Sequence, residues 1–159
     1  MLKLEQEIID LLRKKRLTLG VTESATGGLI SHIITNVPGS SEFYKGSVTA
    51  YANQTKTSVL GVKTETLQQY GAVSSQVAEE MALGGCHILS ADICISDTGV
   101  AGPGGATPDK PVGLFYLGLA HGLTAYSQKH LFRGDREENK DRAARTALGW
   151  LKTYLLNLG

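Results

Sequence analysis

Three residue types that can form an activated nucleophile without histidine or metal occur close together in this chain. Residues 38–56 read PGSSEFYKGSVTAYANQTK. Ser40 and Ser41 stand in a glycine turn, Tyr51 follows ten residues after the second serine, and Lys56 comes five residues later. A neutral lysine can take the proton of a serine hydroxyl, directly or through a tyrosine, and so create an oxygen nucleophile.

Each of these residues also has a purely structural interpretation. Either serine can cap a helical turn over residues 42–44. Tyr51 is a residue type that is common in strands, and Lys56 can be a solvated surface charge. A nucleophile and its base are recognised by geometry rather than by distance in the sequence, so the spacing alone leaves both interpretations open.

A second segment, TESATGG at residues 22–28, joins an expected strand to an expected helix. The start of a helix offers free N–H groups and a partial positive charge, which suit a phosphate. Thr26 adds a hydroxyl, and Gly27 and Gly28 allow a ligand to come close. The alternative is an ordinary helix start in which the glycines permit close packing.

A third segment, TGVAGPGGATPDKPVG at residues 98–113, is rich in glycine and proline. Glycine permits close backbone approach and proline stiffens the chain. The segment leaves the end of an expected strand, where open α/β sheets bind their ligands. Long irregular segments of this kind are usually functional, so we expect a loop that faces a ligand rather than a plain surface turn.

Length and composition favour a single domain over residues 1–159 that acts on a small molecule. The chain has 159 residues, 42% hydrophobic residues and a formal net charge of +1. A near-neutral balance argues against nucleic acid as a partner. No apolar run reaches the ~18 residues of a membrane helix. The acidic N-terminal residues do not resemble a signal peptide, so we expect a cytoplasmic protein without a membrane partner.

The cysteines and histidines predict no metal site and no disulfide. Cys86 and Cys94 are the only cysteines, too few for a disulfide framework or a zinc cluster, and we expect free buried thiols. The four histidines are scattered without a metal-ligand spacing. We therefore expect neither a metal nor another cofactor.

The hydrophobic pattern predicts helices that alternate with strands, followed by a hairpin. We expect helices over residues 2–15, 29–37, 53–61 and 75–89, with Ser74 as a cap, and a last helix that begins at Asp135. In the helix over 75–89, we expect Val77, Met81 and Ile88 to point inward. We expect strands over residues 17–22, 46–53, 92–99 and, around a turn at 121–122, 112–122 and 124–132. Such an order favours a three-layer α/β/α domain with a mixed β-sheet.

Taken together, these segments resemble the C-terminal domain of the CinA family of competence/damage-inducible proteins. The matching stretches also include LGV at 60–62, YGAVSSQVAEEMA at 70–82 and FRGDREENK at 132–140. They lie in order over most of the chain, and several motifs in order are far more specific than any one of them.

The resemblance implies hydrolysis of the carboxamide of nicotinamide mononucleotide to nicotinate mononucleotide and ammonia. It assigns Ser41 as the nucleophile, with Tyr51 and Lys56 as its partners. Homo-oligomers, dimers or larger, are also implied by the family. The substrate-binding residues expected from the matching motifs are Glu23, Ser24, Thr26, Gly27, Gly28, Ser40, Asn53, Gly102, Gly104, Gly105 and Arg136.

Two positions depart from the family pattern. Ala25 stands where cysteine is usual, and Gln54 replaces a carboxylate near Lys56. The rival interpretation is a non-catalytic nucleotide-binding or regulatory module that has kept the pocket and lost turnover. The presence of all three expected catalytic residues favours the enzyme.

Overall fold

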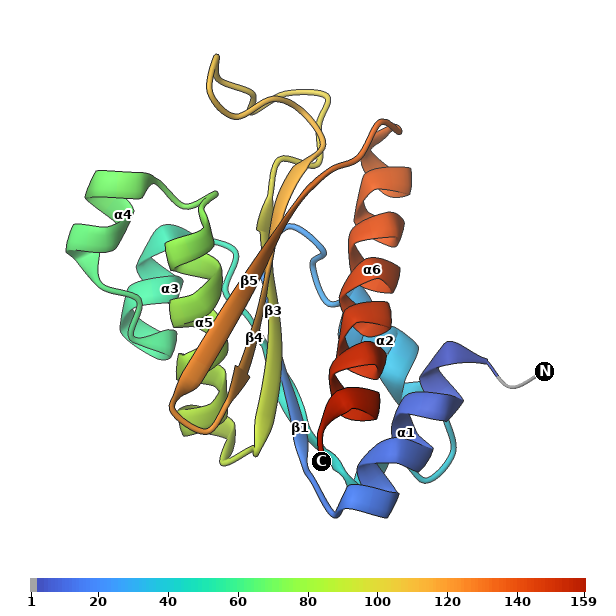
Figure 1. Cartoon of the computed structure of the whole chain (residues 1–159). Helices are drawn as coiled ribbons and strands as arrows, with labels where there is room; N and C mark the ends of the chain where they lie inside the picture. The colour runs from blue at the N-terminus through green and yellow to red at the C-terminus, as the bar shows by residue number, and fades with distance from the viewer. Residues whose placement is uncertain (1–2) are drawn as a thin grey trace.

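A five-stranded mixed sheet lies at the centre of the computed structural model, which describes residues 3–159 (Figure 1). The strand order is β2-β1-β3-β4-β5. β2, β1 and β3 are parallel, whereas β4 pairs antiparallel with β3, and β5 antiparallel with β4. The strands are β1 (Leu19–Glu23), β2 (Tyr44–Thr49), β3 (Ile93–Gly99), β4 (Leu114–His121) and β5 (Thr124–Leu131).

Helices cover both faces of this sheet, which confirms the predicted three-layer α/β/α arrangement (Figure 1). On one face lie α1 (Leu4–Lys15), α2 (Leu29–Thr35) and α6 (Arg136–Asn157). On the other lie α3 (Asn53–Leu60), α4 (Thr64–Tyr70) and α5 (Ser75–Leu89). Among the described residues, no helix combines the length and apolar character needed to cross a membrane.

Two predicted helix starts are confirmed by their caps. The Ser74 side chain accepts a hydrogen bond from the main-chain N–H of Val77, 3.3 Å away, at the start of α5. Asp135 and Glu138 form a reciprocal capping box at the start of α6. Such caps satisfy main-chain donors that a helix cannot satisfy internally.

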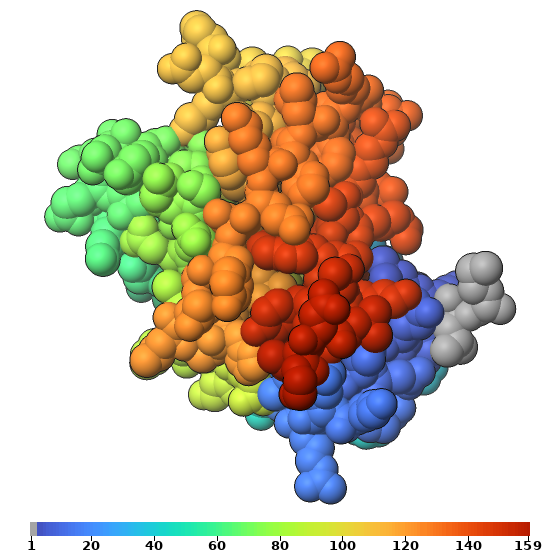
Figure 2. Space-filling model, in the orientation of Figure 1, coloured from blue at the N-terminus to red at the C-terminus, as the bar shows by residue number. Residues whose placement is uncertain are grey.

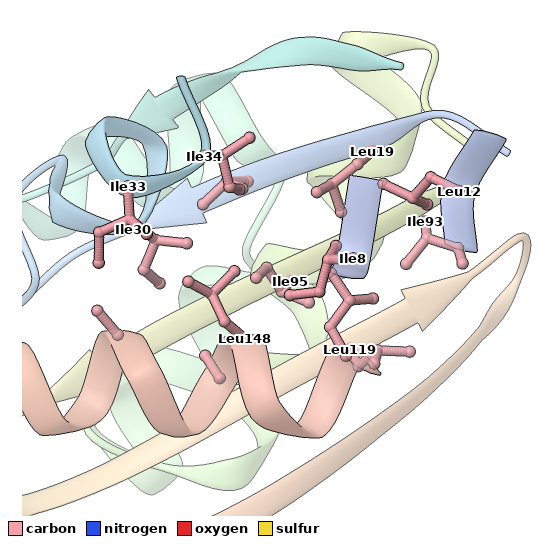
Figure 3. Close-up of a cluster of buried hydrophobic side chains, with 14 of the residues drawn as sticks. Ile8, Leu12, Leu19, Ile30, Ile33, Ile34, Ile93, Ile95, Leu119 and Leu148 are labelled. Carbon is pink, nitrogen blue, oxygen red and sulfur yellow. The ribbon is translucent and has the colours of Figure 1, made fainter. Parts of the chain in front are cut away.

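The larger core lies between the sheet and the layer of α1, α2 and α6. Figure 3 shows side chains from these helices meeting those of β1, β3 and β4. A smaller cluster on the other face joins the end of β2 to α3 and α5, and consists of Ala50, Leu60, Val62, Val77 and Met81. The two cores pack on opposite faces of the sheet and so fix the positions of its strands.

On the α3–α5 side, one helix was missed and two sequence predictions were wrong. α4 was not predicted, and the strand that we expected to contain Tyr51 ends at Thr49. Ile88, expected to point inward, is 47% exposed. Gly84 packs against Leu60, the last residue of α3. Ile88 lies one turn further along α5, beyond the end of α3, and α3 therefore does not cover it.

Gly84 allows α3 and α5 to approach each other closely. A Cβ atom at this position would lie 1.9 Å from the carbonyl oxygen of Leu60. That distance is far shorter than any real contact, so a side chain would push the two helices apart. Because α3 carries Lys56 one turn before Leu60, Gly84 also sets the position of that lysine.

We predict that Gly84→Ala destabilises the protein by about 1–3 kcal/mol, although alanine normally favours a helix interior. The matched control is Gly149→Ala in α6, where an added Cβ meets no atom within 4 Å. There the same substitution should stabilise the protein by up to about 1 kcal/mol. Urea unfolding measures both; equal effects of the two substitutions would contradict the close contact at Gly84.

Candidate active site

A pocket lies at the edge of the sheet where the parallel strands β1, β2 and β3 end. Open α/β sheets generally bind ligands at this edge. The pocket has a volume of about 280 Å³. Its lining comes from the segment after β1, the start of α3, the residues before α5, the glycine-rich loop after β3 and the start of α6: Ser24, Ala25, Tyr51, Asn53, Lys56, Ala72, Val73, Thr98, Gly99, Val100, Ala101, Gly102, Gly104, Gly105 and Arg136.

Strand register brings the ends of β1 and β2 together. Glu23 pairs with Thr49 in the parallel ladder, and the N–H of Ala50 donates to the Glu23 carbonyl oxygen at 2.8 Å. On the other side of β1, Thr22 pairs with Ser96 of β3. The chain therefore leaves β1 at Ser24 with the Tyr51 segment on one side and the end of β3 on the other.

Lys56 is the most unusual side chain of the pocket wall, because it is only 1% exposed. Its Nζ donates to the main-chain carbonyl oxygen of Tyr51 at 3.0 Å. Burial lowers the pKa of Lys56, and the charge of Asp97 opposes this effect in part. A lysine whose pKa is lowered in this way loses its proton more readily, which is what a general base requires.

Ser24 supplies a hydroxyl to the same pocket. The residue is 8% exposed, and its side-chain oxygen makes no hydrogen bond within residues 3–159. Its main-chain N–H donates to Asp97 Oδ1 at 3.0 Å, which fixes the backbone but leaves the hydroxyl available. The N–H of Ala25, which also lines the pocket, has no acceptor in the same described segment. A free N–H directly after a nucleophile is a suitable oxyanion donor.

Tyr51 and Arg136 form the rim of the pocket. Tyr51 is 62% exposed, and its phenol oxygen accepts a hydrogen bond from Arg136 Nη2 at 3.2 Å. Arg136 Nη1 donates to the Gly102 carbonyl oxygen at 2.8 Å. The guanidinium thus joins α6, the glycine-rich loop and the segment before α3 at the mouth of the pocket, and places a permanent positive charge there.

The glycine-rich loop after β3 projects beyond the sheet, at the top of Figures 1 and 2, and is tied down at several points. Asn139 of α6 is fully buried, and its Nδ2 donates to the Ala101 carbonyl oxygen at 3.0 Å. Lys110 donates to the Tyr70 carbonyl oxygen at the end of α4. These contacts fix the loop at both sides of the pocket.

Two buried carboxylates lie beneath the segment that carries Ser24. Glu23 Oε1 and Asp97 Oδ1 lie 2.6 Å and 2.5 Å from the hydroxyl oxygen of Thr26. Because one hydroxyl has one proton, it can donate to only one of the two carboxylates at a time. Burial raises the pKa of Asp97 to about 6, so below that pH its own proton satisfies the second contact.

The predicted phosphate site at Thr26, Gly27 and Gly28 does not fit this arrangement. Both donors of Thr26 are bound to carboxylates, since its N–H donates to Asp97 Oδ2 at 3.1 Å. Glu23 also accepts the N–H groups of Ile30 and Ser31 at the start of α2, at 2.8 Å and 3.1 Å. The anion at this helix start is therefore a carboxylate of the protein itself. Gly27 and Gly28 line a separate hollow beside Lys140.

Within a single chain, Ser41 does not lie in the pocket with Tyr51 and Lys56, so the predicted grouping of these three residues is wrong. Ser40 and Ser41 lie in a 3₁₀ turn, η1 (Ser40–Glu42), that precedes β2, whereas Tyr51 follows it. Six strand residues separate the two ends by roughly 20 Å. Arg13 of α1 contacts Glu42 at 3.7 Å, so the turn is held at the opposite edge of the sheet.

The structure thus brings together eight of the sequence-predicted site residues: Ser24, Tyr51, Asn53, Lys56, Gly102, Gly104, Gly105 and Arg136. Ser40 and Ser41 lie elsewhere, and Glu23 and Thr26 lie beneath the pocket floor. Sequence reasoning missed Asp97 and Asn139. A carboxylate within the apolar strand segment DICISDTG was the available signal for Asp97, because buried carboxylates need several donors.

Comparison with known proteins identifies relatives that match nearly the whole chain. The family model for the CinA C-terminal domain matches residues 1–155. A CinA-like protein of Dictyoglomus thermophilum is 49% identical over 156 residues, which are 98% of this chain and 38% of that protein. A CinA-like protein of Thermotoga maritima is 42% identical over 153 residues, 96% of this chain and 37% of the relative. The chain therefore spans less than two fifths of these curated relatives.

Solved structures share the fold over nearly their full length. The competence damage-inducible protein A of Klebsiella pneumoniae superposes with a TM-score of 0.95 at 29% identity, over 98% of this chain and 97% of that one. The competence/damage inducible protein CihA of Agrobacterium tumefaciens gives a TM-score of 0.92 at 36% identity, over 97% and 94% of the two chains.

Proposed function

This chain belongs to the CinA C-terminal domain family, and we propose that it hydrolyses the carboxamide of nicotinamide mononucleotide to nicotinate mononucleotide and ammonia. One observation carries the proposal: a buried lysine and a serine with an unbound hydroxyl line the same pocket. A serine amidohydrolase that uses lysine as its base needs these two groups, the hydroxyl as nucleophile and the amine as proton acceptor. Ser24 takes the place of Ser41 as nucleophile in this proposal.

The acylation step uses three groups of the pocket. Neutral Lys56 takes the proton of the Ser24 hydroxyl, and the oxygen attacks the carboxamide carbon. The N–H of Ala25 stabilises the oxyanion that forms on the carboxamide oxygen. Collapse of this tetrahedral intermediate breaks the C–N bond, and the proton held by Lys56 passes to the leaving nitrogen, which departs as ammonia.

Deacylation repeats the same proton transfers with water. A water molecule gives a proton to Lys56 and attacks the acyl carbon, and Ser24 leaves with the proton returned by the lysine. Tyr51 lies at the rim and closes the mouth over the substrate together with Arg136. A pocket of about 280 Å³ is small for a whole nucleotide, so the nicotinamide end enters it and the phosphate stays at the mouth.

We predict that Ser24→Ala lowers kcat for ammonia release by about a thousandfold or more, because the nucleophile is removed. Ser41→Ala should change kcat by no more than about twofold, as a surface substitution outside the pocket. Ammonia release from nicotinamide mononucleotide by the two purified variants decides between the serines. A fully active Ser24→Ala variant would exclude Ser24. Substrate binding by the wild type without any ammonia release would favour the non-catalytic module.

Lys56 can be tested separately from the serine. If it is the general base, kcat/KM rises with pH as the lysine loses its proton. Lys56→Arg should then be nearly inactive, because a guanidinium stays protonated, and Lys56→Met should be equally impaired. Substantial activity in Lys56→Arg, with little in Lys56→Met, would instead assign the residue as a fixed cation. Profiles of kcat/KM against pH for both variants make the distinction.

Arg136 is the expected phosphate contact, since the start of α2 is occupied by Glu23. We predict that Arg136→Gln raises KM for the mononucleotide by roughly tenfold to a hundredfold, the usual loss of a hydrogen bond to a charged group. KM for the riboside should change little. Arg133→Gln, an exposed arginine of the same segment, is the matched control. Equal losses for nucleotide and riboside in Arg136→Gln would remove the phosphate contact from this residue.

A further inference from the structure

Asp97 holds the main chain on both sides of Ala25. Its side chain is fully buried, accepts two main-chain N–H groups and contacts the Thr26 hydroxyl. The N–H of Ser24 donates to Oδ1 at 3.0 Å, the N–H of Thr26 to Oδ2 at 3.1 Å, and the Thr26 hydroxyl lies 2.5 Å from Oδ1. The peptide that follows the proposed nucleophile is therefore clamped from below by one side chain.

The same carboxylate is also the charge that acts on Lys56. It is the group whose field raises the pKa of Lys56 against the effect of burial. Lys56 and Ser24 line one pocket, and Asp97 binds Ser24 directly. Other titratable groups on the surrounding elements include Glu23 at the end of β1, Tyr51 before α3, Arg136 and Lys140 on α6, Glu79 and Glu80 on α5, and Cys94 on β3.

We propose that Asp97 is a positioning residue of this site: it orients the Ser24 segment and, through its negative charge, stabilises the protonated form of Lys56. Its catalytic consequence rests on the proposed amidase function. The coupling between Asp97 and Lys56 does not, because it is a property of the folded protein without substrate.

A carboxylate near a buried lysine base keeps the lysine basic enough to accept a proton. Burial alone makes a lysine easy to deprotonate, but it also makes the neutral amine a weak acceptor for the proton of a serine. A nearby anion restores part of that basicity and stabilises the ammonium that forms when Lys56 takes the proton. Burial raises the pKa of Asp97 itself to about 6, so the anion is present above that pH.

The test compares the wild type with Asp97→Asn, which removes the charge and keeps the shape. The first measurement is kcat/KM for ammonia release against pH. The second is the NMR titration of the Lys56 side chain in the substrate-free protein. We expect both midpoints to move to lower pH in Asp97→Asn, and kcat/KM above the midpoint to fall roughly tenfold to a hundredfold as Ser24 loses its orientation. Asp141→Asn, which removes an exposed charge on α6, should leave both midpoints unchanged.

An unchanged Lys56 midpoint in folded Asp97→Asn would overturn the proposal and leave Asp97 with a structural role only. If Asp97→Asn does not fold, Thr26→Val and Thr26→Ser provide the test. Valine removes a donor that favours the charged form of Asp97, so the Lys56 midpoint should move to lower pH, whereas serine should retain it. Identical midpoints in these two variants would overturn the proposal.

The two measurements also separate this proposal from the proposed function. A wild type that releases no ammonia from any amide, but whose Lys56 midpoint moves in Asp97→Asn, would uphold the coupling and overturn the amidase. An active wild type whose midpoints do not move in Asp97→Asn would uphold the amidase and overturn the coupling.

Discussion

Two buried carboxylates at the ends of neighbouring parallel strands organise the entire segment between β1 and α2. Glu23 accepts the first N–H groups of α2, and Asp97 accepts those of Ser24 and Thr26. The N–H groups of Ser24, Thr26 and Ile30 would otherwise be buried without a partner, at a cost of about 1–3 kcal/mol apiece. The sharp exit of the chain from β1, which turns Ser24 toward the pocket, is therefore stabilised by side chains rather than by regular secondary structure.

Most of the fold could be predicted because its signals are local. The caps at Ser74 and Asp135 and the turn at Gly122 depend on neighbouring residues, and the structure confirms them. The errors arise where packing between distant segments decides. The exposure of Ile88 depends on where α3 ends against Gly84, which lies far from α3 in the sequence. No periodic pattern carries that information.

Part of the pocket lining was predicted, for a related reason. Tyr51, Asn53 and Lys56 lie within one turn of the start of α3, so their proximity in sequence is also proximity in space. Ser41 is nearly as close in sequence, but an entire strand lies between, and a strand is the most extended structure that a chain can form. Ser24 is more distant in sequence and reaches the pocket because β1 and β2 are parallel neighbours. Topology decides which serine lines the same pocket as the lysine.

The hydrogen bonding of Lys56 suggests how a substrate itself can produce the base. An ammonium group has three donors, and within residues 3–159 Lys56 Nζ has one acceptor, the Tyr51 carbonyl oxygen. Water in the open pocket can accept from the remaining donors. In the proposed reaction, a nicotinamide ring that fills the pocket would expel this water, and its pyridinium would add a second positive charge. Both changes favour loss of the proton, and the neutral amine still keeps its bond to Tyr51. In that proposal, the carboxylate of Asp97 limits this effect, because its charge raises the pKa of Lys56 and keeps the amine basic enough to accept the proton of Ser24.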